Sequence, residues 1–234
     1  MNYIIINGKR STTLNGLIVT SLPPISKPKI RANLEQIDGV DGDIINKLGY
    51  GAYDKTFEIG LSYNYNVDDV ITYFNTEGTI TFSNEPDKYY YFTTLNQIDF
   101  EKLLRFKKAK VTIHVQPFKY SNVESAKTFN FTTENQSLVV RNNGNIYSKP
   151  IITLTGSGTI NISLNGTDVI TVDLNGSMVL DTQSQNAYDP ETKDFLNRSV
   201  IGDLKNLYLA VGVNTISWTG NLTKVEIDFC SRWI

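Results

Sequence analysis

Three aspartates lie close together in the segment IDGVDGDI, residues 37–44, and carboxylates at this spacing could coordinate calcium. Asp38, Asp41 and Asp43 would supply three of the roughly six to eight oxygen ligands that calcium takes. The glycine and the bidentate acid of an EF-hand loop are both out of register here. A repeated DG is also typical of tight turns, because glycine adopts positive φ without strain. We interpret the segment as a turn, and calcium binding stays an open alternative.

Other residue types that carry chemistry are scarce. Cys230 is the one cysteine, which excludes an internal disulfide, and a small buried hydrophobe is the simpler interpretation than a nucleophile. His114 is the one histidine, which makes a zinc site or a histidine-based nucleophilic site implausible. The acids Asp181, Asp189 and Glu191 lie in expected turns, where spacing alone cannot pair them for glycoside hydrolysis. The sequence therefore predicts a non-enzyme with no catalytic, cofactor-binding or metal-ligating residue.

The charge composition of the chain argues against some classes of partner. The net charge of −2, from 22 basic and 24 acidic residues, argues against a nucleic-acid-binding surface. One short basic cluster is interpreted as a solvated face or a protein contact; it contains Lys102, Arg105, Lys107, Lys108 and Lys110. The first apolar run is too short for a signal peptide, and no apolar stretch approaches the ~20 residues that cross a bilayer. We therefore expect synthesis in a cytoplasm and no membrane partner.

Strand patterns dominate the elements that must position these residues. Residues 53–65 alternate, with Phe57, Ile59, Leu61 and Tyr63 expected on one face. The segment 29–37 alternates in the same way through Ile30, Ala32 and Leu34. A hairpin is expected around NEPD, and YYYF, residues 89–92, has aromatic side chains on both faces, which suggests a strand buried on both sides or at an interface.

One stretch in the first half predicts a helix. Asp68 and Asp69 favour its positive N-terminal end, Val70, Ile71 and Phe74 recur at helical spacing, and Gly78 is placed to stop it. FEKLLRFKKA, residues 100–109, fits a short helix or a strand equally well.

The amino-acid composition of the chain changes near residues 120–128. Beyond that point short strands alternate with NG and GSG turns, which is typical of an antiparallel sandwich or barrel. Residues 181–195 form a polar loop in this interpretation. We expect two domains, 1–125 and 126–234, in a mostly β protein.

A carbohydrate-binding module is the main rival function. Such a module would use Trp218 and the 181–198 loop, although Trp218 and Trp233 fit packing roles better.

The motifs, taken in order, resemble the distal tail protein family of siphophages, long-tailed non-contractile phages of Gram-positive bacteria. The segments that carry the resemblance are IDGVDGDI, YDKTFEIGLSY, DDVITYF, VQPFKY, NNGNIYSKPIITLTGSG, INISLNG, GVNTISWTG and the final RWI. Val40 departs from the pattern, since relatives often have arginine there.

The resemblance implies a structural virion protein of the tail tip. Residues 1–125 would form a β-barrel or sandwich belt domain with one helix, which closes into a homo-hexameric ring, single or stacked. Residues 126–234 would form a galectin-like or carbohydrate-binding-module-like β-sandwich arm. The implied partners are the tail tube protein, the tail-tip or tail-associated lysin protein and, in some phages, receptor-binding proteins. DNA would meet the ring only in transit through its channel, and no cofactor is implied.

Overall fold

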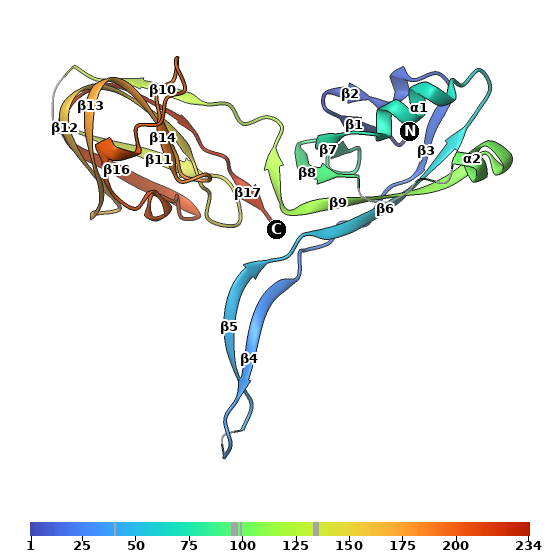
Figure 1. Ribbon diagram of the computed structural model, residues 1–234, viewed down its shortest axis with the longest axis horizontal. Helices are drawn as coiled ribbons and strands as arrows, with labels where there is room; N and C mark the ends of the chain where they lie inside the picture. The colour runs from blue at the N-terminus through green and yellow to red at the C-terminus, as the bar shows by residue number, and fades with distance from the viewer. Residues whose placement is uncertain (40, 95–97, 99, 133–135) are drawn as a thin grey trace. The chain divides into compact units, whose positions relative to one another are not determined.

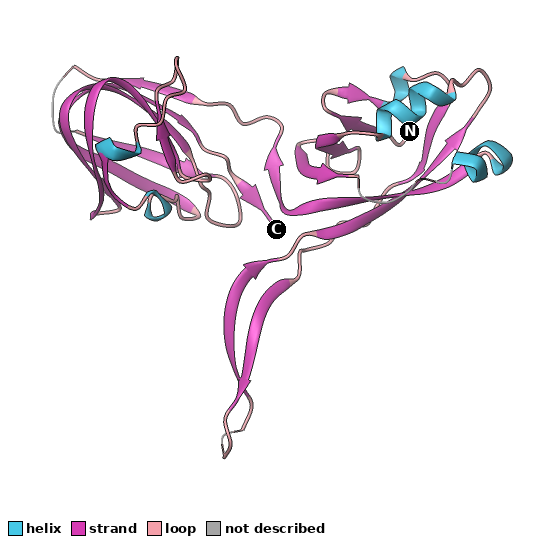
Figure 2. Cartoon of the chain, in the orientation of Figure 1, coloured by secondary structure: helices cyan, strands magenta, loops and turns pink. Residues whose placement is uncertain are grey.

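The computed structural model describes residues 1–39, 41–94, 98, 100–132 and 136–234. The chain divides into two compact units, Met1–Asn122 with Ile234, and Val123–Trp233. Strands dominate both units (Figure 2), so the predicted mostly β fold class is confirmed. Among the described residues, no helix has the length and apolar character to cross a bilayer.

The first unit is built on one curled antiparallel sheet (Figure 1). Its strands run in the order β2-β1-β7-β8-β9-β6-β3. Their bounds are β1 Ile4–Ile6, β2 Lys9–Arg10, β3 Leu17–Ser21, β6 Tyr53–Leu61, β7 Glu77–Phe82, β8 Lys88–Thr93 and β9 Lys108–Ser121. The predicted NEPD hairpin is confirmed as β7 and β8, which pair with each other. A 3₁₀ turn, η1, covers Ser11–Thr13.

Helix α1, Val67–Phe74, covers the core of this unit. The Asn66 side chain caps it by accepting a hydrogen bond from the Asp68 amide at 3.0 Å. Val70, Tyr73 and Phe74 are buried at helical spacing, and the Phe74 ring lies 6.2 Å from that of Phe57. The predicted helix is confirmed.

Two details of the sequence interpretation are wrong in this region. Gly78 does not end α1; the helix ends at Phe74, and Gly78 lies inside β7 with φ +133°. A Cβ there would meet the Asn7 side chain at 2.2 Å, so the glycine serves close packing. Tyr63 is not on the buried face, because β6 ends at Leu61 and the tyrosine side chain is 94% exposed. Residues 100–109 had two alternatives, a short helix or a strand. The helix is confirmed for Phe100–Phe106, which form α2, and β9 begins after it.

The second unit is a second curled antiparallel sheet around its own core. Its strands run β10-β16-β12-β13-β14, with β11 also on β16 and β15 on β13. The bounds are β10 Lys127–Asn130, β11 Ser137–Asn142, β12 Ile151–Leu164, β13 Thr167–Asp181, β14 Asn186–Tyr188, β15 Val200–Gly202 and β16 Gly212–Asp228; the 3₁₀ turns are η2 Asn197–Ser199 and η3 Leu204–Asn206. The short strand β17, Arg232–Trp233, is not part of this sheet.

Glycines allow the long strands of this unit to bend. Gly156 of β12 pairs with Gly176 of β13, and the register of β12 on β16 shifts at Gly156. A Cβ on Gly156 would lie 2.1 Å from the Asn221 carbonyl oxygen, so only glycine fits this approach of two backbones.

Candidate functional site

The IDGVDGDI segment lies at the tip of a β-hairpin in the first unit. The hairpin consists of β4, Ile30–Gln36, and β5, Asp43–Tyr50, which together form a separate two-stranded sheet (Figure 1). Gly39 and Gly42 have φ values of +83° and +89°, so the predicted turn with its positive-φ glycines is confirmed. Val40, where the sequence departs from the distal tail pattern, lies outside the described residues.

The alternation of Ile30, Ala32 and Leu34 does not produce a buried face, contrary to the usual meaning of that pattern. The side chain of Leu34 is 62% exposed and that of Ile45, its direct partner on β5, is 60% exposed. The same holds for the hairpin's other large apolar side chains: Ile30, Ile37, Ile44 and Leu48. No third strand joins β4 and β5 among the described residues, so these side chains have no layer to pack against. The hairpin therefore exposes apolar surface that monomers usually bury.

The three aspartates are exposed at the hairpin tip. Asp38 and Asp41 lie in the turn and Asp43 begins β5, opposite Gln36. Over the described part of the chain, no three His, Cys, Asp or Glu side chains form a group that could hold a metal ion.

The basic cluster lies where α2 joins β9. Arg105, Lys107 and Lys108 are exposed, as is Lys110; the side chain of Lys102 lies outside the described residues. Phe106, in the middle of this cluster, is 62% exposed. Lys107 has φ +59°, and its Nζ donates a hydrogen bond to the Tyr65 hydroxyl at 2.7 Å. Positive charge and an exposed aromatic ring thus share one surface.

Aromatic side chains occupy both faces of β8, as the YYYF pattern predicts. Tyr90 and Phe92 are buried in the core. On the opposite face the Tyr89 ring stacks on that of Tyr120 at 5.5 Å, and Tyr91 lies edge-on to Tyr120 at 5.1 Å. Tyr91 is 44% exposed.

The sequence interpretation did not identify one buried cation, the side chain of Lys55. Lys55 lies on the same face of β6 as Phe57 and Ile59 and is 3% exposed, with its Nζ donating a hydrogen bond to the Pro24 carbonyl oxygen at 2.9 Å. Its Nζ lies 5.0 Å from the centre of the Tyr90 ring. Burial lowers the pKa of Lys55 to about 8, against the opposing charge of Glu85 and with the like charge of Lys119. The signal that could have found it is its position two residues before Phe57, in phase with the buried face of the strand.

Glu85 links this lysine to its surroundings. The Lys119 Nζ donates to Glu85 Oε1 at 2.8 Å, and the Tyr90 hydroxyl donates to Glu85 Oε2 at 3.2 Å. Both partners of the Lys119–Glu85 ion pair are largely buried. The charge of Lys119 offsets part of the attraction of Glu85, so burial remains the largest cause of the lowered pKa of Lys55.

The motifs of the second unit serve its architecture. The amide of Asn142, 1% exposed, donates to the carbonyl oxygens of Ile146 at 3.0 Å and Leu209 at 3.1 Å, and accepts from the Gly144 amide at 2.9 Å. A Cβ on Gly144 would lie 2.2 Å from the Arg232 carbonyl oxygen. The NNGN and RWI segments therefore meet in the fold.

The GVN segment has a similar role. Asn214 is fully buried, and its amide donates to the carbonyl oxygens of Ala210 and Gly212. Its Oδ1 accepts from the Ala210 amide and from Asn165 Nδ2, which anchors the turn between β12 and β13.

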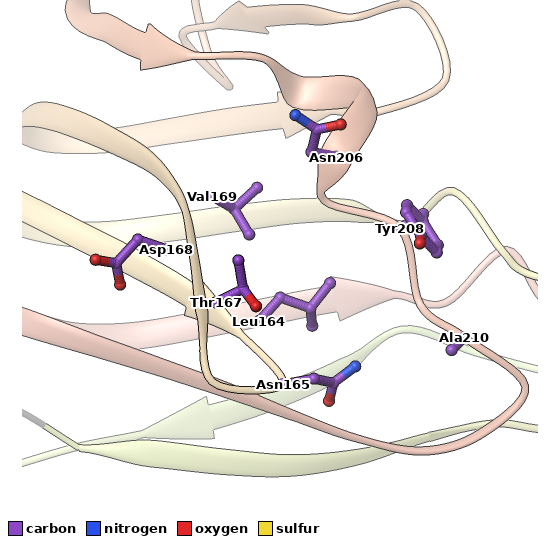
Figure 3. Close-up of a pocket in the computed structure, with 8 residues that line it drawn as sticks. All are labelled: Leu164, Asn165, Thr167, Asp168, Val169, Asn206, Tyr208 and Ala210. Atoms are coloured by element: carbon purple, nitrogen blue, oxygen red, sulfur yellow. The ribbon is translucent and has the colours of Figure 1, made fainter.

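A pocket of about 360 Å³ lies beside this turn. Figure 3 shows that its lining comes from the β12–β13 hairpin end and from the end of η3 with the segment after it, with Tyr208 and Asn206 on one side and Thr167 on the other. The other lining residues are Leu164, Asn165, Asp168, Val169 and Ala210. Tyr208 is 45% exposed, and Asp168 Oδ1 accepts a hydrogen bond from the Ser163 hydroxyl at 2.6 Å.

The residues of the rival carbohydrate interpretation are placed differently. Trp218 is 3% exposed, and its ring lies 4.7 Å from that of Phe131, so it packs in the core and cannot stack on a sugar. The expected polar loop of residues 181–195 contains the short strand β14, paired with β13. The Asp181 and Asp189 carboxylates accept hydrogen bonds from amides of their own turns, Gln183 and Glu191 respectively.

The lone histidine and cysteine are not brought together with other reactive groups. His114 Nδ1 lies 2.7 Å from Asp54 Oδ1, in a cross-strand pair at the surface of β6 and β9. Cys230 lies between β16 and β17, is half-buried and has φ +45°. Burial and the nearby Asp228 carboxylate raise the pKa of its thiol to about 12, which suppresses nucleophilic reactivity.

The comparison with known proteins rests on structure. No protein-family model matches the sequence, and no curated protein matches it. The crystal structure of SPP1 Dit, a paradigm of hub adsorption apparatus in Gram-positive-infecting phages, is similar with a TM-score of 0.66 and 19% identity, over 97% of this chain and 98% of that one. Two phage P2 baseplate structures in the activated conformation also match over most of their length. The one with Ca has a TM-score of 0.43 and 9% identity, covering 97% of both chains. The one with Sr has 0.42 and 10%, covering 96% of this chain and 97% of that one. The chain therefore has a Dit-like fold, as the resemblance of its sequence to distal tail proteins predicts.

Proposed function

We propose that the protein is a structural subunit of a phage tail hub, a distal tail protein that forms a homo-hexameric ring at the tail tip. The observation that carries the proposal is the Dit-like fold over 97% of the chain, because it covers both units and not a single common domain. In this proposal the protein catalyses no reaction and belongs to the virion.

The surface of the first unit supports self-association. The hairpin β4–β5 exposes apolar side chains, and the tyrosine cluster of Tyr89, Tyr91 and Tyr120 adds an aromatic face. A ring needs two different complementary surfaces on each subunit, because head-to-tail contacts close only at one rotation. In our proposal the first unit, within the predicted belt domain 1–125, supplies both, and the second forms the arm.

The remaining partners follow from the place of a hub in a tail. We propose the tail tube protein on one side of the ring and a tail-tip protein on the other, with receptor-binding proteins as further candidates. The small net charge of −2 suits a channel through which DNA passes, since a basic lumen would retain phosphates.

Light scattering coupled to size-exclusion chromatography of the full chain tests the ring. We expect a species of about six times the 26.3 kDa chain mass and six-fold rings in negative-stain images of the same peak. A chain that remains monomeric from 1 to about 100 µM, where interfaces of standard size are occupied, would refute the proposal.

Saccharide binding is the second candidate function, and the pocket of Figure 3 favours it. The exposed Tyr208 ring lies beside the polar side chains of Asn206 and Thr167, which suits a sugar's apolar face and hydroxyl groups. Calorimetric titration with purified Gram-positive cell-wall polysaccharide tests it. Binding should be lost in Tyr208→Ala and retained in Tyr63→Ala, which removes an exposed ring from the other unit. Equal binding by both variants, or none by the wild type, would exclude this pocket.

A further inference from the structure

We propose that the β4–β5 hairpin of one copy docks on the α2–β9 junction of a second copy, by its acidic tip and its exposed apolar side chains. The inference rests on the proposed ring and identifies the two surfaces that form its repeated contact. Four features of the first unit support it: charge, apolar exposure, reach and asymmetry.

The charges of the two surfaces are opposite and unmixed. Residues 35–44, EQIDGVDGDI, contain four acids and no base. Residues 104–110, LRFKKAK, contain four bases and no acid. The acids of the tip, Glu35, Asp38, Asp41 and Asp43, are all exposed, as are the bases of the junction, Arg105, Lys107, Lys108 and Lys110. Complementary patches of this kind steer association and fix its register.

Both surfaces also expose apolar side chains among their charges. Near the hairpin tip, Ile37 is 49%, Ile44 46% and Ile45 60% exposed. At the junction, Phe106 is 62% and Leu104 37% exposed. Interface centres are enriched in aromatic residues and arginine, as Phe106 and Arg105 are here, whereas charged residues such as the lysines suit the polar rim. Contact between the two surfaces would remove all five side chains from water.

The hairpin has the reach for such a contact. Its paired strands contain seven and eight residues, which at about 3.3 Å per residue gives a ribbon roughly 25 Å long. Charge along the ribbon is graded, because its base has Lys29, Arg31 and Lys47 whereas its tip is acidic. A basic receiving surface therefore attracts the tip and repels the base, which sets the direction of docking.

The contact is asymmetric, as a ring requires. Each copy donates one hairpin and receives another on its α2–β9 junction, so the interface is heterologous and can close. The helix end and the strand start that form the receiving surface are joined at Lys107, whose side chain is held by Tyr65. Arg105 and Lys108 are therefore the better positions for substitution.

Charge reversal tests the contact in the full-length protein. The tip reversal is Asp38→Lys with Asp41→Lys, and the junction reversal is Arg105→Glu with Lys108→Glu. Each should weaken self-association about 100-fold or more, because like charges then face each other across the contact. A 1:1 mixture of the two variants should assemble again, since every contact in an alternating ring pairs opposite charges. The control for the junction reversal is Arg141→Glu with Lys193→Glu, which makes that variant's change in net charge on the other unit and should assemble as the wild type does.

Zero-length carbodiimide cross-linking between unlabelled and ¹⁵N-labelled wild-type copies gives a second readout. We expect mixed-isotope links from tip aspartates to Lys107, Lys108 or Lys110. Links confined to single copies, or reversals that leave assembly unchanged, would overturn this contact while the ring itself stands. Reversals that stay apart on mixing would also overturn it. A wild-type chain that neither assembles nor cross-links between copies would overturn both the ring and the contact.

Discussion

Lys55 should make the stability of the first unit rise with pH in the alkaline range. Its pKa is about 8 in the folded protein and near 10.5 when the side chain is solvated, because burial opposes the charged form. Below pH 8 the Lys55 side chain is protonated in both the folded and the unfolded state. The cost of burying its charge then lowers the free energy of unfolding in full. Between pH 8 and 10.5 the unfolded state binds more protons than the folded state, so the free energy of unfolding increases with pH. The difference of 2.5 pKa units corresponds to about 3 kcal/mol.

Substitution of Lys55→Met isolates this contribution. Other groups act in the opposite direction: the raised pKa of Cys230, about 12, lowers stability above roughly pH 9, and buried Tyr53 and Tyr73 do so above about pH 10. These groups are common to both proteins. The wild-type minus variant difference in unfolding free energy should therefore rise by about 3 kcal/mol from pH 7 to 10.5, whatever its value at pH 7.

The assay has to report on the first unit alone. Trp218 is buried in the core of the second unit, so its fluorescence, recorded in a Trp233→Phe background, follows that unit. Amide hydrogen exchange in peptides from β6 and β9, measured across a urea series at each pH, follows the first. The tryptophan transition is the internal control and should be the same in both proteins. A difference curve that stays flat, or that falls with pH, would refute the account of Lys55.

Three further predictions concern the second unit. Asn142→Ala removes three buried hydrogen bonds and should lower the urea unfolding free energy by about 3 kcal/mol; a loss below about 1 kcal/mol would contradict that role. Gly156→Ala should lower the tryptophan-detected thermal midpoint, because its Cβ overlaps the Asn221 carbonyl. Gly158→Ala should lower it less, because its Cβ meets open space and only its φ of +81° strains the alanine. Cys230 should react with iodoacetamide at pH 8 at least about 100-fold more slowly in the native than in the urea-unfolded protein; equal rates would exclude a raised thiol pKa.

Local patterns predicted the local structure well. The two acids and the apolar spacing before Phe74 indicate a helix because capping and burial act within a few residues of each other. The DG pairs indicate a turn because positive φ is a property of single glycines. Helix ends are harder to predict: Gly78 has the pattern of a helix stop, yet its role is to leave room for the side chain of Asn7, which lies in a turn distant in sequence.

What the sequence could not predict depends on distant partners. The alternation around Leu34 indicates a strand correctly, but burial requires a second layer, and in this chain the described fold supplies none. The phase of Lys55 with Phe57 indicates the buried face, but its surroundings there, Pro24, Tyr90 and Glu85, come from distant parts of the sequence. The pocket next to Tyr208 combines two segments about forty residues apart, and spacing alone does not reveal it.

The isolation of the β4–β5 hairpin has a consequence for how a ring of this protein would form. A two-stranded ribbon is at best marginally stable in water, so part of each contact's free energy is spent on ordering the ribbon. Single contacts between two copies are then weak and short-lived. The last contact of a closed ring is different, because it joins ends that are already tethered and meet at high effective concentration. Solutions of the protein should accordingly contain free subunits and complete rings, with few open fragments between them.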